Sequence, residues 1–237
     1  MLWQPIRPFE FTSPVVDIIK YPLLAIKPIS TIIFAVPYLR SKLTFRQINE
    51  RILEIPFVLS RILKNQNILD VGSNESFISL MAASQNNFVI ALDLRSATIN
   101  HHRITNVQAD ITRWSKPDYF DTIICLSTLE HIGLEVYGGK KNSNADQLAI
   151  NNIYASLKSK GRLLLTVPAS VLFQTTPTWR SYDFLSLQKL LKKFKKINYE
   201  FCVRDENQHW SLVDKIPKDH AFDLHMPSAV ALIEAIK

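Results

Sequence analysis

The feature that most constrains the fold is a series of short apolar runs that alternates with segments of helical periodicity. The runs are 67–71, 88–94, 106–110, 120–128, 162–168 and 197–205, and the clearest helical segments between them are 76–85 and 145–159. Strands this apolar are typical of a parallel sheet covered by helices on both faces. We therefore predict an α/β fold with a doubly wound, mostly parallel sheet, whose crossover at 95–105 is irregular.

The N-terminal region has a different pattern. It carries six prolines before residue 40, and prolines at that spacing interrupt any helix. A helical pattern then starts at residue 46 and runs to 63, with Ile48, Ile52, Ile55 and Leu59 as its apolar stripe and Pro56 as a kink. We predict two parts, a proline-rich, apolar N-terminal arm with a helix (1–60) and a domain at 61–237.

The uncharged stretch Pro28–Leu39 of this arm is too short to span a membrane. It is long enough to lie in a groove or on a membrane surface, so we expect weak membrane contact through the arm. The N-terminus shows no secretory signal, and Cys125 and Cys202 are too few for a disulfide framework. These features predict a cytoplasmic protein, peripheral to the inner face of a membrane if the arm binds there.

The formal net charge of +7 raises the question of a nucleic-acid partner. The densest lysine cluster lies between 189 and 196, where Leu187, Leu190, Leu191 and Phe194 take the apolar positions of a helix. Its lysines then form the solvated face of that helix. No basic motif interleaved with aromatic residues is present, so we do not expect a nucleic-acid partner.

Polar residues stand where the predicted strands end. Asp70, Asp93 and Asp110 end three of them, and a fourth ends in the polar stretch Ser127–His131. In an open parallel sheet these ends share one edge, where ligands bind. An acid about 20 residues after a glycine turn, as Asp93 is after Gly72, is placed to accept the hydroxyls of a ribose.

Together these segments resemble the class I S-adenosylmethionine-dependent methyltransferases, and most closely the type 11 branch. The matching stretches are ILDVGSNES, VIALDL, VQADI, FDTIICLSTLEHIGL and LKSKGRLLLTVP, between residues 61 and 205. The resemblance implies a Rossmann-like methyltransferase fold with a seven-stranded sheet, a final strand at 229–237, and S-adenosyl-L-methionine as cofactor.

The resemblance also implies roles for individual residues. Asp70 would orient the first loop or meet the cofactor's ammonium group, and Asp93 would bind the ribose. Asp110 would bind the adenine or, alternatively, cap the turn at Thr112. The full set implied to bind the cofactor is Asp70, Gly72, Ser73, Asn74, Asp93, Leu94, Asp110, Ile111, Leu126 and Ser127.

The first loop departs from the family's glycine-rich pattern, because Asn74 and Ser76 stand where later glycines are usual. Asparagine tolerates a positive φ better than most residues, so we expect Asn74 to hold a left-handed position. Ser76 begins the following helix and could cap it. We interpret the loop as one that still binds the cofactor.

Methyl transfer requires mainly that nucleophile, carbon and sulfur be held in line, with a general base for hydroxyl or ammonium acceptors. His131 and its neighbour Glu130 are the catalytic candidates, although His131 could instead position the loop. No spacing of histidines and carboxylates predicts a metal site. We expect a small-molecule, sugar or glycan-lipid acceptor; the alternatives are an RNA or protein methyltransferase and a non-catalytic remnant that acts as a binding module.

Overall fold

The computed structural model describes residues 49–75, 77–96, 99–206, 209–223 and 226–237. Residues 50–237 form one compact unit. The predicted arm up to residue 48, with its expected membrane contact, lies outside the described residues, so this division of the chain stays a prediction. None of the helices in the described ranges is long and apolar enough to cross a membrane.

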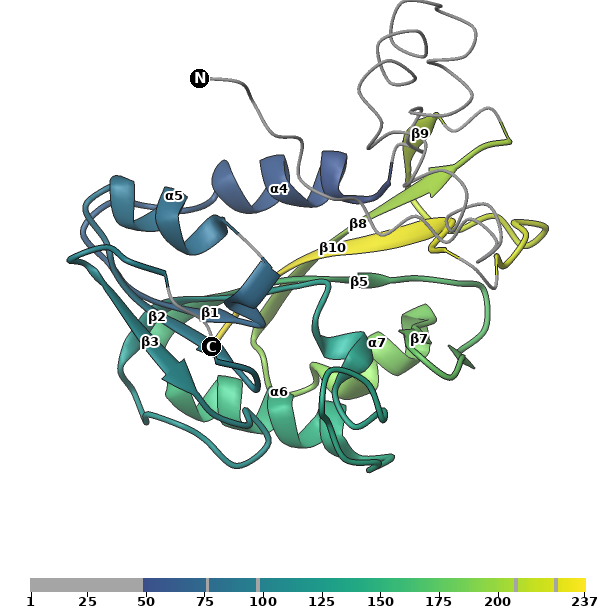
Figure 1. The fold of residues 1–237 in the computed structure, drawn as a ribbon. Helices are drawn as coiled ribbons and strands as arrows, with labels where there is room; N and C mark the ends of the chain where they lie inside the picture. The colour runs from purple at the N-terminus through teal and green to yellow at the C-terminus, as the bar shows by residue number, and fades with distance from the viewer. Residues whose placement is uncertain (1–48, 76, 97–98, 207–208, 224–225) are drawn as a thin grey trace, which may run out of the picture. The chain divides into compact units, whose positions relative to one another are not determined.

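One large sheet runs through the unit, with helices on both faces (Figure 1). Its strands are β1 (Asn67–Val71), β2 (Phe88–Asp93), β3 (Ile104–Gln108), β4 (Phe120–Leu126), β5 (Leu157–Pro168), β8 (Lys196–Arg204), β9 (Trp210–Val213) and β10 (Ala229–Ile236). The helices are α4 (Arg51–Leu59), α5 (Ile78–Ser84), α6 (Ala145–Ser156) and α7 (Phe184–Leu190), with two short 3₁₀ helices, η1 (Ser73–Glu75) and η2 (Leu129–His131).

The strand order is β3-β2-β1-β4-β5-β10-β8-β9. The pairs from β3 to β5 are parallel, whereas β10 runs antiparallel to both its neighbours and β9 runs antiparallel to β8. This confirms the predicted fold class and the final strand. The sheet has eight strands rather than seven, because β9 was not expected.

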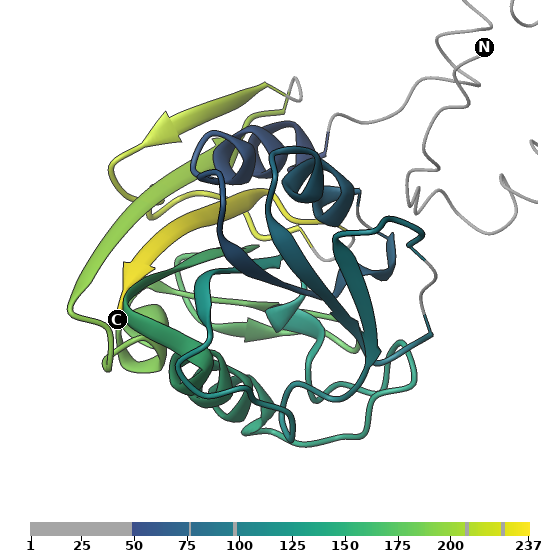
Figure 2. The ribbon, with the colours of Figure 1, turned by 90° about the vertical axis from the view of Figure 1, so that its left-hand side faces the viewer.

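The two faces of the sheet bury separate apolar clusters. α4 and α5 cover one face, where Phe57, Val58 and Ile78 pack with Ile68 and Ile124. α6 and α7 cover the other, and Figure 2 shows the twisted sheet between these layers. The exposed lysines at 189, 192, 193, 195 and 196 surround the buried apolar positions of α7 and its exit, as predicted.

Helix α4 differs from its predicted form. It begins at Arg51 rather than at residue 46, and the expected apolar stripe is wrong at Ile52, which is 54% exposed. Ile55 and Leu59 of that stripe are partly buried against the core, and Ile48 lies outside the described residues. The buried positions are instead Glu54, Phe57 and Val58. The sheet selects this face because Phe57 and Val58 pack on its apolar surface, a contact that periodicity within one helix cannot specify.

Three further segments differ from the prediction. α6 ends at Ser156, and β5 begins at Leu157, so Lys160 and Gly161 lie inside a strand with an irregular pairing. Lys160 takes a φ of 63°, which accommodates this irregularity. β3 ends at Gln108 rather than at Asp110. The described part of the crossover between β2 and β3 contains no helix, which agrees with the irregular pattern of its sequence.

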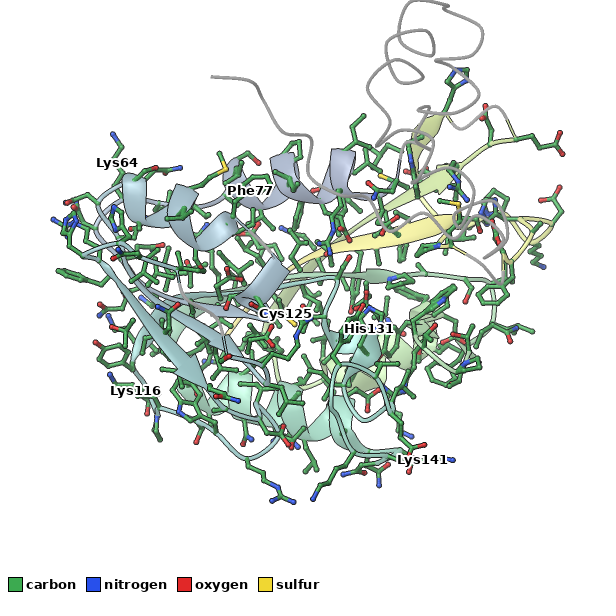
Figure 3. All side chains as sticks on the ribbon, viewed as in Figure 1. Lys64, Phe77, Lys116, Cys125, His131 and Lys141 are labelled. Carbon is green, nitrogen blue, oxygen red and sulfur yellow. The ribbon has the colours of Figure 1, made fainter. Side chains whose placement is uncertain are left out.

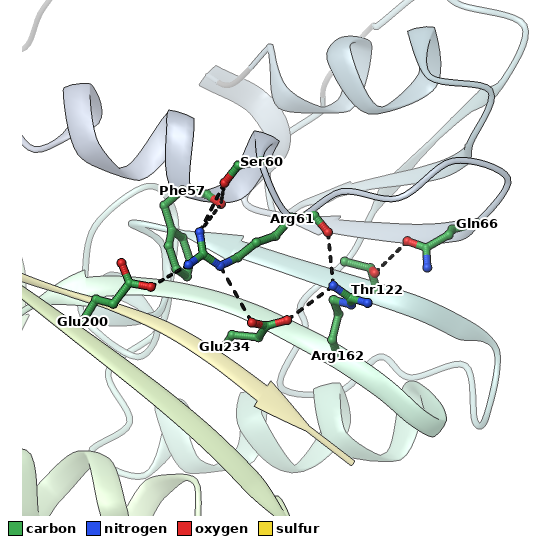
Figure 4. Close-up of polar contacts among 8 residues, drawn as sticks. All are labelled: Phe57, Ser60, Arg61, Gln66, Thr122, Arg162, Glu200 and Glu234. Carbon is green, nitrogen blue, oxygen red and sulfur yellow. Dashed lines mark hydrogen bonds and ion pairs between the residues drawn. The ribbon is translucent and has the colours of Figure 1, made fainter.

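Polar contacts fasten the end of α4 to the strands beneath it (Figure 4). Arg61 Nη2 lies 2.5 Å from Glu200 Oε1 of β8, and Arg61 Nε lies 3.8 Å from Glu234 Oε2 of β10. Arg162 of β5 contacts the other oxygen of Glu234 at 3.3 Å, and the guanidinium of Arg61 stacks over the Phe57 ring. α4 is thus tied to three strands at one end.

Candidate functional site

The loops that follow β1 and β4 touch each other. Gly72, the residue after β1, has a φ of +79°, and its N–H donates to Leu92 O of β2 at 2.8 Å. A Cβ added at Gly72 would lie 2.2 Å from Thr128 Oγ1. Only glycine fits here, because the loop after β4 packs directly on its backbone. We call Gly72, Ser73, Asp93, Ser127 and Thr128 the strand-end site.

Asp93 joins the first loop to the end of β2. Its carboxylate is 6% exposed; Oδ2 accepts from Asn74 N at 3.1 Å, and Oδ1 accepts from Arg95 N at 2.8 Å and from Arg95 Nε at 3.2 Å. Asn74 lies in η1 and has no positive φ. The expected left-handed position at Asn74 is therefore wrong, because Gly72 makes the left-handed turn and no other described residue of this loop has a positive φ. Ser76 lies outside the described residues.

Ser73 and Asp70 are buried beneath this loop. Ser73 is fully buried, and its Oγ has no hydrogen-bond partner within the part of the chain that the structure describes. Asp70 accepts from Ser79 Oγ of α5 at 2.6 Å. Burial raises the pKa of Asp70 to about 6. The contact with Ser79 agrees with the loop-orienting role, and both roles of Asp70 stay predictions.

Asp110 caps a turn. Its Oδ1 accepts from Thr112 N at 2.9 Å and from Thr112 Oγ1 at 2.7 Å, which is the structural alternative that the sequence left open. Ala109 N donates to Asp93 O at 2.9 Å, so Asp110 still follows close to the end of β2. Ile111 is buried, and Leu94 is 39% exposed at the end of β2. The predicted adenine contacts remain a prediction.

The end of β4 is strained. Ser127 has a φ of +41°, unusual for a residue with a side chain, and strain of this kind is common at functional sites. Its N–H donates to Thr166 Oγ1 at 3.0 Å, and its Oγ donates to Glu54 Oε1 at 2.5 Å. Leu126, before it, is buried. Glu54 of α4 thus reaches across to the strand-end site.

His131 and Glu130 follow in η2. His131 Nδ1 lies 2.6 Å from Thr178 O, and because a carbonyl can only accept, Nδ1 is the donor of this hydrogen bond. Nε2 lies 3.8 Å from Glu130 Oε1, and in a neutral ring it would carry the lone pair. Figure 3 places His131 and Cys125 in the middle of the unit, between the two helical layers, and Lys64, Lys116 and Lys141 at its periphery.

Glu130 is buried and short of partners. It is 2% exposed, and Oε2 receives no hydrogen bond from the described residues. Burial, with smaller contributions from Glu54 and Glu50, raises the pKa of Glu130 well above its usual range. A buried carboxyl group with a raised pKa keeps its proton more readily than an exposed one, and such groups are common at functional sites.

Sequence reasoning missed Glu54 because α4 was interpreted only as a helix leading to the domain. A signal was present: Glu54 is the one acid in the otherwise apolar run from Ile52 to Leu59. Thr128 was missed as well, and only the tertiary structure shows its contact with Gly72.

A pocket lies beside the end of β5. It is lined by Ala169, Ser170, Val171, Leu172, Gln174, Lys218, His220, Ala221, Phe222 and Ser228. The adjoining stretch Trp179–Tyr182 is buried, and Arg180 donates to Ile132 O at 2.7 Å. Arg180 therefore clamps the loop after β4 onto β7 (Arg180–Ser181), whose partner is β6 (Gln174–Thr175). In the described ranges no three histidines, cysteines or carboxylates are grouped so that they could hold a metal ion.

Solved structures share this fold. The 1,6-didemethyltoxoflavin-N1-methyltransferase of Burkholderia thailandensis is 14% identical with a TM-score of 0.58, over 98% of this chain and 93% of that one. The N-methyltransferase NodS of Bradyrhizobium japonicum is 12% identical with a TM-score of 0.51, over 94% and 98%. A methyltransferase from Archaeoglobus fulgidus is 13% identical with a TM-score of 0.56, over 84% and 98%.

A comparison of sequences gives the family. No curated protein matches the chain significantly. A family model described as "Methyltransferase domain" matches residues 42–215, which is most of the chain and includes all residues of the strand-end site. With the strand order of the sheet, this match shows that the chain belongs to the methyltransferase domain family, as a class I S-adenosylmethionine-dependent methyltransferase.

Proposed function

We propose that the protein transfers the methyl group of S-adenosyl-L-methionine to a small-molecule acceptor, a sugar or glycan-lipid intermediate among them. The observation that carries this proposal is the strand-end site, where the loops after β1 and β4 meet beside the Asp93 carboxylate. Three strand ends then face one ligand, as binding in an open α/β sheet requires.

The residues present fit the cofactor. Ser73 Oγ is buried without a partner among the described residues, so it is a polar atom that a ligand could satisfy. Gly72 permits close approach of the backbone, and the Asp93 carboxylate could bind a ribose if Arg95 moves from Oδ1. The exposed Leu94 and the buried Ile111 would pack against the adenine.

The cofactor supplies an electrophilic methyl group on sulfur. The task of the chain is to hold an acceptor in line with it and to exclude water. Ser127, fixed by Thr166 and Glu54, would shape the methionine end through its backbone. His131, with its lone pair on Nε2, would take a proton from the acceptor, and Glu130 beside it would stabilise the charged ring.

Calorimetric titration with S-adenosylhomocysteine tests the cofactor site. We expect the wild type to bind and Asp93→Ala to bind at least about tenfold more weakly, because two charge-assisted hydrogen bonds are lost. Asp118→Ala is the control, since Asp118 is 71% exposed and precedes the start of β4, at the opposite end of that strand from Ser127. Wild-type protein that releases no heat would favour the non-catalytic alternative. Equal affinity in Asp93→Ala would remove the ribose assignment.

A further inference from the structure

A pocket and an exposed apolar surface adjoin each other near the end of β5, where the chain turns through β7 into α7 (Figure 1). We call the pocket that has Ser170, Lys218 and His220 in its lining the β5 pocket; its volume is about 210 Å³. Pockets that enclose a whole drug-sized ligand are larger, about 300–1,000 Å³. The β5 pocket therefore fits one group of a ligand and leaves the rest of that ligand outside.

The polar groups of the β5 pocket are suited to an anion. None of the described residues that line it is acidic, whereas Lys218 and His220 are both basic. Lys218 is exposed and forms no ion pair or hydrogen bond with the other described residues. The neighbouring Asp219 is exposed and is not part of the lining. An ammonium group without a partner, in a pocket without carboxylates, favours a negatively charged ligand.

One wall of the pocket is held in place by contacts within the protein. His220 Nε2 donates to Ser228 O at 3.0 Å, because a carbonyl can only accept, and Ser228 Oγ donates to Ala221 O at 2.9 Å. The ring of Phe222 packs on Trp179, with centroids 5.4 Å apart. The wall is thus formed before a ligand arrives, so little ordering of the chain opposes binding.

The same wall leads towards the strand-end site. Trp179, on which Phe222 packs, directly follows Thr178, whose carbonyl accepts from His131 Nδ1 at 2.6 Å. β5 also pairs with β4, and Ser127 follows the end of β4. The β5 pocket therefore lies across one short loop from His131.

The surface beside the pocket is unusually apolar. Five large apolar side chains, with exposed fractions from 36% to 73%, form what we call the apolar rim: Val171, Leu172, Phe173, Phe184 and Leu185. The carboxylate of Asp183 joins its two parts, because Oδ2 accepts from Phe173 N at 3.3 Å and Oδ1 accepts from Ser186 N at 2.7 Å. Val171 and Leu172 also line the pocket. Consecutive exposed apolar residues of this kind mark binding surfaces.

We propose that the β5 pocket and the apolar rim bind the methyl acceptor, and that this acceptor is an anionic amphiphile. The inference rests on the proposed function. The negatively charged group lies in the pocket against Lys218, and the hydrocarbon part lies outside it, over the rim. Covering the rim removes apolar surface from water, which favours binding. A neutral sugar without a hydrocarbon part would use neither the ammonium group nor the rim.

Calorimetric titration of the protein saturated with S-adenosylhomocysteine tests this substrate class. The probes are octyl phosphate, octyl glucoside and inorganic phosphate, at concentrations at which the octyl compounds form no micelles. We expect octyl phosphate to bind at least about tenfold more tightly than either other probe, since it alone carries both the charge and the chain.

Two substitutions separate the charge from the chain. Lys218→Gln should lower the affinity for octyl phosphate by about fivefold and leave that for octyl glucoside unchanged within about twofold. Leu172→Ser should lower the affinities for both octyl compounds by about fivefold. The matched controls are Lys215→Gln and Leu212→Ser, because both residues are exposed and neither lines the pocket. Both controls should retain the wild-type affinities.

Each part of the inference can fail separately. Equal wild-type affinity for octyl phosphate and octyl glucoside overturns the anionic group, and equal affinity for octyl phosphate and inorganic phosphate overturns the role of the rim. An affinity for octyl phosphate that survives both Lys218→Gln and Leu172→Ser overturns the site. Protein that binds S-adenosylhomocysteine but none of the probes overturns the anionic amphiphile alone. Protein that binds no S-adenosylhomocysteine overturns the proposed function and, with it, the assignment of this pocket to an acceptor.

Discussion

At the scale of single residues, Gly72 is a position where the backbone and the packing around it both favour glycine. Gly72→Ala adds a methyl group at a φ of +79° and places it 2.2 Å from Thr128 Oγ1. We expect a loss of about 3 kcal/mol in unfolding free energy, from the left-handed backbone and from the clash together. Urea denaturation measures it, and titration should show weaker binding of S-adenosylhomocysteine.

The variant Gly138→Ala separates the cost of a left-handed backbone from the cost of the clash with Thr128. Gly138 has a φ of +85°, but a Cβ there meets nothing within 4 Å. The control should therefore lose only the backbone contribution, about 1 kcal/mol. If both variants lose the same amount, the contact between Gly72 and Thr128 does not restrict this position.

Asp70 gives the stability a pH dependence. Burial raises its pKa from 3.8 to about 6, so between these values the folded state binds more protons than the unfolded state. Stability from this group is then present at low pH and is lost as pH rises through about 6, by up to about 3 kcal/mol. Asp70→Asn keeps an acceptor for Ser79 Oγ and should remove this loss.

Chemical denaturation of the wild type and Asp70→Asn at pH 5 and pH 8 checks whether Asp70 lowers the stability as the pH rises. We expect the variant to gain stability relative to the wild type at the higher pH. If the variant and the wild type lose the same amount of stability between pH 5 and pH 8, Asp70 does not contribute to the loss. The pKa of the buried Asp70 would then not be raised.

At the scale of elements, the position of α4 matters most, because it brings Glu54 to Ser127. Arg61→Ala removes contacts to β8 and β10 and the stacking on Phe57. Arg61 is 28% exposed, so solvent screening limits the loss, and we expect about 1–2 kcal/mol. Hydrogen exchange of the α4 amides should accelerate.

Lys64→Ala is the control for this prediction, since Lys64 is exposed and lies three residues further along the chain. Its stability should match that of the wild type within about 0.5 kcal/mol. If the α4 amides of Arg61→Ala exchange as slowly as those of the wild type, the apolar packing of Phe57 and Val58 is sufficient to hold the helix.

At the scale of the whole molecule, we predict that the net charge of +7 reflects solvated surface rather than a nucleic-acid site. Changing Lys189, Lys192 and Lys193 to glutamate lowers the formal net charge by six, to +1. All three are exposed, so we expect the unfolding free energy to change by less than about 0.5 kcal/mol. Affinity for S-adenosylhomocysteine should stay the same.

An electrophoretic mobility assay with RNA completes this test. We expect no specific complex with either the wild type or the triple variant. A wild-type complex that the three substitutions abolish would assign these lysines to a partner surface, in favour of the RNA methyltransferase alternative.

The sequence by itself determined the alternation of buried strands and helices, the parallel core of the sheet and the polar strand ends. Residues near one another in the chain decide these features, since apolar run length and turn residues are local properties. The resemblance added the last strand, which β10 confirms, whereas β9, a short strand with only two of its four residues partly buried, carried too weak a pattern to predict.

Only the tertiary structure decided what lies between the strand ends. It placed Thr128 on Gly72, Asp110 on its own turn, and the buried acid of α4 beside the loop after β4. These contacts join residues up to 73 positions apart. They depend on how helices dock on the sheet, and the free energy of docking comes from surfaces that no single segment contains.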